Sequence, residues 1–173
     1  EVRQAVCYAV PYEQILREVY LDTAEPWRSA LPMGTPMASG DGWPYRHDPD
    51  RARELLREAG MPGGFETDLF VDVGNAEHVA AARLIVAALA EVDIRVELEL
   101  LDSTTHWAGA RYFRPYPMLI YSDHHQVPDP YYGLVHDYAP GKLGLINVGN
   151  YSNDRVVEIT AAVERTPDPL ERE

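Results

Sequence analysis

The sequence is poor in cysteine and has no long apolar run. Cys7 is the single cysteine of the 173 residues, so the chain cannot form an intrachain disulfide. Its place among the apolar residues of the first predicted helix favours a small buried hydrophobe over a reactive thiol. No apolar run approaches the roughly 20 residues that a membrane-spanning helix needs.

Positive charge is also scarce. The chain carries 15 Lys and Arg residues against 28 Asp and Glu residues, which gives a formal net charge of -13 at pH 7. Nucleic acids and anionic membranes attract proteins through clustered positive charge. The charge balance therefore argues against nucleic acid as a partner and against binding to an anionic membrane surface.

Enzyme signatures are missing as well. The chain has no G-x-S-x-G elbow, no G-x-x-x-x-G-K-[ST] phosphate loop and no G-x-G-x-x-G fingerprint after a predicted strand. Asp48, Asp68 and Asp72 form no recognisable carboxylate pair. We therefore expect no enzymatic activity and no cofactor. A hydrolase or transferase with an unrecognised site and a purely structural α/β interaction module are the alternatives from other classes.

A sharply bounded helix lies within residues 45–60, YRHDPDRARELLREAG. Asp48 suits the N-cap position, and Pro49 suits the first helical position because its missing N–H has no partner to lose there. Gly60 suits the position just after the helix, where a left-handed backbone is common. The apolar stripe that should face the core consists of Ala52, Leu55, Leu56 and Ala59.

The middle of the chain predicts a strand, a helix and a second strand. Residues 65–73 and 94–101 alternate between apolar and polar, whereas residues 75–92 have a helical pattern. The strand residues expected to face the core are Phe65, Leu69, Val71, Val73, Ile94, Val96, Leu98 and Leu100. Such a βαβ unit should make a right-handed crossover between two parallel strands.

Further elements surround this unit. Residues 22–43 read as a long irregular loop, and residues 117–121 as a short apolar strand. Helices are expected at residues 2–10, 13–20, 104–112, 129–138 and 154–165. Trp107 is expected in the core, and Ile159 on the packed side of the last helix. The sum predicts an α/β layered domain with a small, largely parallel sheet and flanking helices.

Polar and aromatic residues gather directly after the third predicted strand, in residues 121–132, YSDHHQVPDPYY. Ligands of open α/β sheets bind beyond the carboxyl ends of the strands, so these residues are candidates for a pocket wall. The structural alternative is that Asp123 caps a turn and that His124 and His125 are solvated loop residues. The same region could offer zinc or nickel donors from Asp123, His124, His125, Asp129, His136 and Asp137. No His pair has the spacing of a helical metal site, so we expect no metal.

Four stretches also carry a resemblance to a known family. The segment of residues 45–60 resembles the [YW]-x-x-DP-x-x-A-x-x-LL-x-x-AG segment of the extracellular solute-binding proteins of peptide/nickel-type ABC importers, solute-binding family 5. Residues 1–10, EVRQAVCYAV, resemble its VRQA-x-x-YA-[IV] helix, and residues 94–102, IRVELELLD, resemble its GI-x-VEL strand. Asp129-Pro130 and residues 150–172 resemble its DP and N-x-S-N…DP-x-ER segments.

This resemblance implies one lobe of a type II periplasmic-binding-protein-like fold, with residues 1–173 as a single second lobe truncated at both ends. It implies an exported receptor, periplasmic or membrane-anchored, that traps a solute between two hinged lobes. The implied partners are the missing first lobe, a membrane permease and the solute. A dipeptide or oligopeptide is the first solute expected, with an oligosaccharide or nickel as alternatives.

The resemblance also implies ligand-binding residues. In peptide-binding members a W-x-x-D pattern shortly before the DP lines the cleft, and its Asp pairs with the amino terminus of the ligand. Here Tyr121 stands where Trp is usual, and Asp123 lies in roughly the place of that Asp. Trp27 belongs to the loop that runs close to the cleft in the family. With His124, these are the expected ligand-binding residues of the chain.

Overall fold

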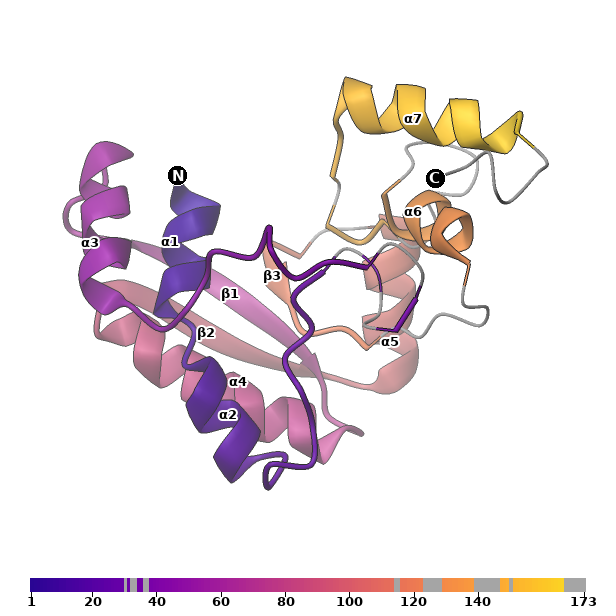
Figure 1. Ribbon diagram of the computed structural model, residues 1–173. Coiled ribbons are helices and arrows are strands. Elements are labelled where there is room, and N and C mark those ends of the chain that lie inside the picture. Colours follow the sequence, from indigo (N-terminus) through magenta and orange to yellow (C-terminus); the bar gives the residue numbers. More distant parts are fainter. Residues whose placement is uncertain are drawn as a thin grey trace. The chain divides into compact units, whose positions relative to one another are not determined.

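The computed structural model describes residues 1–29, 31, 34–35, 38–113, 116–122, 129–138, 147–149 and 151–166. Two compact units make up the chain. The sheet unit consists of Glu1–Pro26, Pro44–Gly109 and Pro115–Tyr121. The helical unit consists of Trp27–Trp43, Ala110–Arg114 and Ser122–Glu173. The elements of each unit are labelled in Figure 1.

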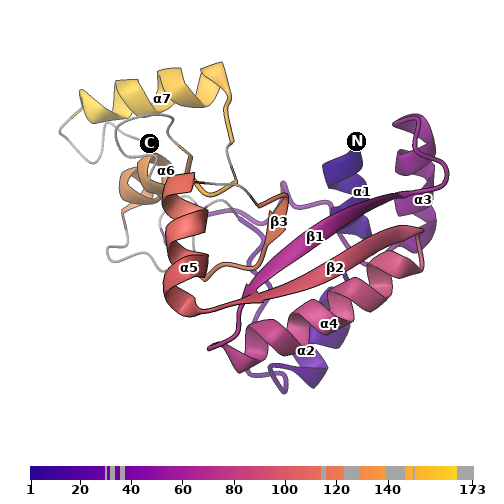
Figure 2. The same cartoon turned by 180° about the vertical axis from the view of Figure 1, so that it is seen from behind.

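Three parallel strands form the centre of the sheet unit. Strand β1 (Phe65–Asp72) pairs with β2 (Ile94–Leu101) from Phe65 opposite Ile94 to Asp72 opposite Leu101. The short strand β3 (Met118–Leu119) pairs with the other edge of β1, which gives the order β2-β1-β3 (Figure 2). The predicted parallel pair is confirmed. All three strands therefore end at one edge of the sheet, which we term the carboxyl edge.

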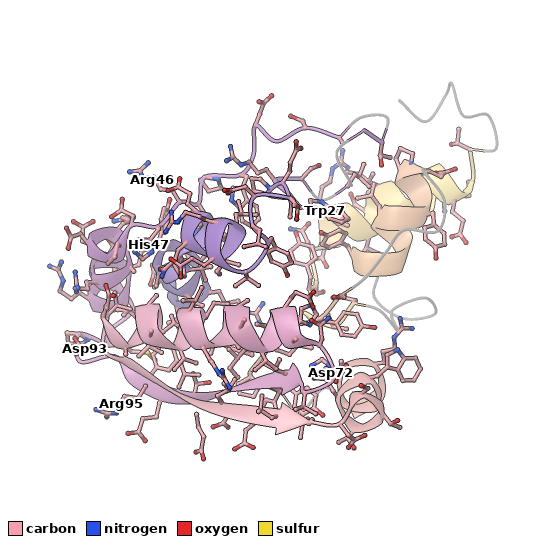
Figure 3. The ribbon with its side chains drawn as sticks, turned by 90° about the horizontal axis from the view of Figure 1, so that it is seen from below. Trp27, Arg46, His47, Asp72, Asp93 and Arg95 are labelled. Atoms are coloured by element: carbon pink, nitrogen blue, oxygen red, sulfur yellow. The ribbon has the colours of Figure 1, made fainter. Side chains whose placement is uncertain are left out.

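Helix α4 (Ala76–Ala90) connects β1 to β2 and covers one face of the sheet (Figure 3). Asn75 caps it, with its Oδ1 accepting a bond of 2.9 Å from the backbone amide of His78. Leu89 is buried against Ile94 at one end of the sheet, and partly buried Ile85 contacts both core clusters. Arg95 points away from α4, so the opposite face of the sheet carries the polar residues of the alternating pattern.

Helices α1 (Val2–Ala9) and α3 (Pro49–Glu58) complete this core, with the short α2 (Tyr12–Glu18) beside α4. Asp48 caps α3 as predicted, accepting a 3.0 Å bond from the amide of Arg51. The amide of Asp48 also donates to the carbonyl of Tyr8 over 2.7 Å, which fixes the start of α3 to α1. The buried residues that join the two helices are Ala5, Ala9, Ala52, Leu55 and Leu56.

The sheet unit ends in a helix that changes type. Helix α5 (Ser103–Ala108) follows β2 directly and continues as a π-helical turn, η1 (Gly109–Phe113), whose residues after Gly109 belong to the helical unit. The sequence predicted one helix over residues 104–112, so its existence is confirmed but its last turn is not α-helical. Asp102 caps α5 through the amide of Thr105.

Two helices, α6 (Pro130–Tyr138) and α7 (Asp154–Glu164), pack together in the helical unit. Asn153 caps α7 by accepting bonds from the amides of Arg155 and Val156. The buried amide of Asn147 exchanges two bonds with the backbone of Tyr151, at 2.7 and 2.8 Å. Within the described ranges, every helix is too short or too polar to cross a bilayer.

Four core assignments from the sequence are wrong. Val73 is exposed because β1 ends at Asp72 and Val73 lies in the turn that follows. Leu100 is exposed near the end of β2, which is an edge strand. Trp107 is exposed because its neighbour His106 takes the inward position on α5. Ile159 is exposed because Thr160, about 100° further round α7, is the buried residue.

We predict that Leu89→Ala destabilises the chain by about 2–5 kcal/mol, because Leu89 has no exposed surface and its truncation leaves a cavity. Leu100→Ala is the matched control, since Leu100 is 44% exposed and its loss should cost less than about 1 kcal/mol. Urea unfolding of both variants measures the difference. Equal losses would contradict the core described above.

A second stability prediction concerns the turn between α3 and β1. Gly64 has a φ of +69°, and an added Cβ would lie 1.8 Å from the carbonyl oxygen of Asp93. Gly64→Ala should therefore destabilise the chain by about 1–3 kcal/mol or more, because both strain and a clash oppose it. At Gly63 an added Cβ meets no atom within 4 Å, so Gly63→Ala should leave the urea midpoint almost unchanged.

Candidate functional site

The carboxyl edge of the sheet presents a fixed carboxylate. Asp72 is the last residue of β1, and its Oδ1 accepts bonds of 2.8 Å from both the Ser103 hydroxyl and the Gly74 amide. These bonds, that of Ser103 first, hold the pKa of Asp72 below its usual range, so the side chain is ionised at neutral pH. Figure 3 shows Asp72 at the end of the strands opposite to Arg95.

A neighbouring carboxylate, Asp102, accepts hydrogen bonds on both of its oxygens. Its Oδ1 accepts from the amide of Thr105 at 3.1 Å, and its Oδ2 accepts from the hydroxyl of the same residue at 2.5 Å. Both oxygens are therefore occupied in capping α5, which lowers the pKa of Asp102. Asp102 is a structural residue of the carboxyl edge, whereas both bonds that Asp72 accepts from the described residues end on its Oδ1.

Four rings form a continuous row beside Asp72, which we term the aromatic row. Phe70 stacks on Tyr116 with ring centroids 4.3 Å apart. His106 lies parallel to Tyr116 at 6.2 Å and to Tyr121 at 6.3 Å. The hydroxyl of Tyr116 donates to the carbonyl of Thr105 over 3.2 Å. The row therefore joins residues of β1, α5 and the segments before and after β3.

Gly109 makes room for the centre of this row. A Cβ at Gly109 would lie 1.9 Å from the Tyr116 hydroxyl oxygen, so any side chain there would displace the ring. Burial raises the pKa of Tyr116, and the charge of Asp102 adds to the shift. Tyr116 is therefore a neutral hydrogen-bond donor held in place by its surroundings.

Two histidines near the carboxyl edge are buried. His106 is only 4% exposed, and its Nε2 has no hydrogen-bond partner among the described residues. His78, in the first turn of α4, is also buried. Burial lowers the pKa of His78, the nearby charge of His106 lowers it further, and Asp72 partly opposes both effects. Buried polar atoms are normally paired, so the unpaired Nε2 needs an explanation.

Of the residues predicted to bind ligand, Tyr121 is half-buried at the end of the aromatic row. Trp27 belongs to the helical unit and is 47% exposed. Asp123 and His124, together with His125, lie outside the described residues. All four assignments remain predictions. No group of three His, Cys, Asp or Glu donors suited to a metal occurs among the described residues, which exclude the side chains of His136 and Asp137.

The sequence did not identify Asp72, Ser103 or His106 as candidate site residues. Asp72 and Ser103 each lie at or just after the end of a predicted strand, the position that led to the choice of Tyr121. The same rule could have identified both. His106 had no such signal, because its contacts with the rings of Tyr116 and Tyr121 form only when α5 and the residues around β3 come together in the fold.

The arrangement is suited to binding rather than to nucleophilic chemistry. Ser103 donates its hydroxyl to the Asp72 carboxylate, and the lowered pKa of Asp72 makes this carboxylate a weak base for the proton that a serine nucleophile must lose. A fixed carboxylate beside aromatic rings instead offers charge, hydrogen bonds and apolar contact to a small polar molecule. The surface can therefore hold a solute through its charged and apolar groups together.

Comparison with known proteins gives a consistent family. The profile of the bacterial extracellular solute-binding proteins, family 5 Middle, matches residues 1–144. Heme-binding protein A of Haemophilus influenzae is 32% identical over 115 residues, which are 64% of this chain and 20% of that protein. Glutathione-binding protein GsiB of Escherichia coli K12 is 27% identical over 183 residues, which cover 99% of this chain and 35% of GsiB.

A solved structure shares the fold of this chain. A dipeptide-binding protein of Pseudoalteromonas sp. SM9913, solved in complex with Met-Leu, superposes with a TM-score of 0.88 at 22% identity. The match covers 99% of this chain and 34% of that one. The α/β layered fold expected from the sequence is thereby confirmed. The chain spans about a third or less of the length of these three proteins, between 20% and 35%.

We predict that His78 makes the fold sensitive to acid. Because burial lowers the folded-state pKa of His78, protons bind it more readily in the unfolded state. Its contribution to stability is present above the ordinary histidine pKa of about 6.5 and is lost as the pH falls below it. His78→Gln should therefore lose less unfolding free energy than the unsubstituted chain between about pH 7.5 and pH 5.5. Urea titrations at both pH values measure this, and equal losses would contradict the assignment.

Proposed function

Because the chain belongs to the bacterial extracellular solute-binding proteins of family 5, we propose that it is one lobe of the substrate-binding component of an ABC importer. The single observation that carries this proposal is the surface at the carboxyl edge. There Asp72 is fixed by Ser103, and the aromatic row ends in Tyr121. Such a surface suits the capture of a small polar solute.

The proposed mechanism is closure of two lobes around the solute. The chain covers 34% of the dipeptide-binding protein of similar fold, so a protein of that length has room for a second lobe. Each lobe would contact one side of the solute, which stabilises the closed state through contacts that exist only there. The closed form would then deliver its solute to a membrane permease. Export to the periplasm, or anchoring outside the cytoplasm, is part of the same proposal.

A peptide is the first solute class. One relative is named for glutathione binding, and the Pseudoalteromonas protein of similar fold was solved with Met-Leu. Tyr121 can stack on a flat group of such a ligand, and Asp123, His124 and Trp27 complete the proposed ligand-binding set. An oligosaccharide or nickel is the alternative within the family, while a hydrolase with an unrecognised site is the rival of another class.

We predict that the full-length protein containing this chain is stabilised by peptides. In a thermal-shift screen with Met-Leu, reduced glutathione, mannohexaose and NiCl2, a peptide should raise the melting temperature by several degrees. Saturation at about 100 times Kd adds roughly 2.7 kcal/mol to the free energy of unfolding. The peptide should be recovered unchanged by chromatography after long incubation.

Two controls separate the rival functions. Consumption of the peptide would contradict a receptor and favour a hydrolase, whereas a response to none of the four probes would favour a structural module. The isolated 173-residue chain should bind the same peptide much more weakly than the full-length protein, because the contacts of the other lobe and the closure are absent. Equal affinity of the isolated chain would contradict the two-lobe mechanism.

A further inference from the structure

We propose that the side of β2 turned away from β1, which we term the outer edge, pairs with the same strand of a second copy. The two copies then form a dimer with one continuous sheet. This inference goes beyond the function proposed above and does not depend on it, because the outer edge is separate from the carboxyl edge. Three structural features support it: a regular open strand, a self-complementary order of charges, and an apolar helix beside the strand.

The first feature is the length and regularity of β2. Within the described residues the sheet has the order β2-β1-β3, so β2 has a strand on one side only. Its pairing with β1 runs from Ile94 to Leu101 without a bulge, and the strand contains neither lysine nor proline. Bulges, lysines and prolines are common means of keeping an edge strand from pairing with another chain. In Figure 3, β2 lies in front of β1.

The backbone groups on the outer edge belong to alternate residues of β2. The amide of Val73 donates to the carbonyl of Leu101 over 2.9 Å, so the peptide groups of Leu101 face β1. Successive residues of a strand turn their N–H and C=O groups to opposite sides. Those of Val96 and Leu98 therefore face away from β1. Such a row of outward donors and acceptors is a template for a further strand.

The second feature is the order of charges on the open face, the sheet face opposite to α4. Arg95 and Glu97 are both exposed, and they point to this face because side chains two residues apart share a face. In an antiparallel pair of two β2 strands centred on Val96, each Arg95 lies opposite Glu97 of the second copy. Opposite charges directly across a strand pair stabilise it, whereas like charges destabilise it.

The neighbouring registers lack this match. A register centred on Arg95 sets the two arginines against each other, and one centred on Glu97 sets two glutamates against each other. A register centred on Leu98 places Glu97 opposite Glu99. The register centred on Val96 also sets its outward backbone groups against those of the second copy, where both hydrogen bonds can be exchanged. The charge pattern therefore selects this register.

Arg95 can serve both copies at once. Its Nε donates to Glu66 of the same chain over 2.9 Å, and a guanidinium has further N–H donors in a fixed fork. This ion pair borders a hollow of about 370 Å³ on the open face, which lies at the centre of the proposed register. The residues that line the hollow are Glu66, Thr67, Asp68, Arg95, Val96 and Glu97. A glutamate of the second copy can therefore approach Arg95 from the outer edge.

The third feature is helix α4, which covers the face of β1 and β2 opposite to the open face. Only Glu77, His78 and Arg83 of its fifteen residues are polar. Ala87 and Ala90 are exposed although α1 and α2 also contact this helix. A helix that is apolar nearly all round is normally covered on more than one side. In the dimer the two α4 helices run antiparallel beside the paired strands, and small side chains allow helix axes to approach to about 8–10 Å.

The test mixes two charge-reversed variants of the full-length protein. In a dimer with itself, Arg95→Glu sets two glutamates against each other, and Glu97→Arg sets two arginines against each other. Each variant alone should therefore dimerise poorly. In a dimer of one variant with the other, every facing pair again has opposite charges. Sedimentation velocity with one variant fluorescently labelled measures both kinds of dimer.

We expect the unsubstituted protein to dimerise with a Kd between about 10 μM and 1 mM, since a strand pair with two helices is a small interface. Each variant alone should dimerise at least about 10-fold more weakly, because both facing pairs become repulsive. The equimolar mixture should recover the affinity of the unsubstituted protein. Glu13→Arg, the same change of charge at an exposed position of α2, is the matched control and should dimerise normally.

The urea midpoints of both β2 variants should stay near that of the unsubstituted protein, because the Arg95–Glu66 pair is exposed and contributes little stability. Weak dimerisation of either variant then reflects the interface and not unfolding.

Three results would overturn the inference. The unsubstituted full-length protein could sediment as a monomer up to about 1 mM, whatever other chain its strand edge accepts. It could dimerise while both variants alone dimerise equally well, which would place the interface elsewhere. The mixed variants could fail to recover dimerisation, which would contradict the register centred on Val96. None of these results bears on solute binding, so the proposed function is tested separately.

Discussion

The packing of α4 against the parallel pair β1 and β2 is the constraint on which the rest of the structure depends. Parallel strands cannot be joined by a tight turn, so a crossover helix must return the chain to the start of the sheet. Burial of Leu89 and Val92 against Ile94 holds that helix in place. Once it is formed, β1 and β2 must end at the same edge.

Polar groups from different parts of the chain lie close together at that edge. Asp72 comes from the end of β1, Ser103 and His106 come from the helix after β2, and Tyr121 follows β3. All four take part in contacts that span more than ten positions of sequence, since Asp72 bonds with Ser103 and the His106 ring stacks with that of Tyr121. The chemistry of the surface is therefore a consequence of the parallel topology. Hydrophobic packing on one side of the sheet positions the polar site at its edge.

The same packing explains which sequence predictions succeeded. The helix at α3 was predicted with its cap, because Asp48, Pro49 and Gly60 are local signals that act within a few residues. The alternation of β1 and β2 was read correctly because period-two burial is also local. Trp107 and Leu100 were assigned wrongly because hydrophobic character alone does not decide which residue a neighbouring element covers.

The sequence by itself determined the helices, the two long parallel strands and the family, since propensity, capping and periodicity are properties of short segments. The position of Tyr121 just after a strand was also predictable, while its role in binding ligand stays a prediction. Only the tertiary structure showed that Ser103 fixes Asp72 and that the buried His106 stacks with Tyr116 and Tyr121. These contacts join residues far apart in sequence. Their partners depend on strand order and register, which no local pattern encodes.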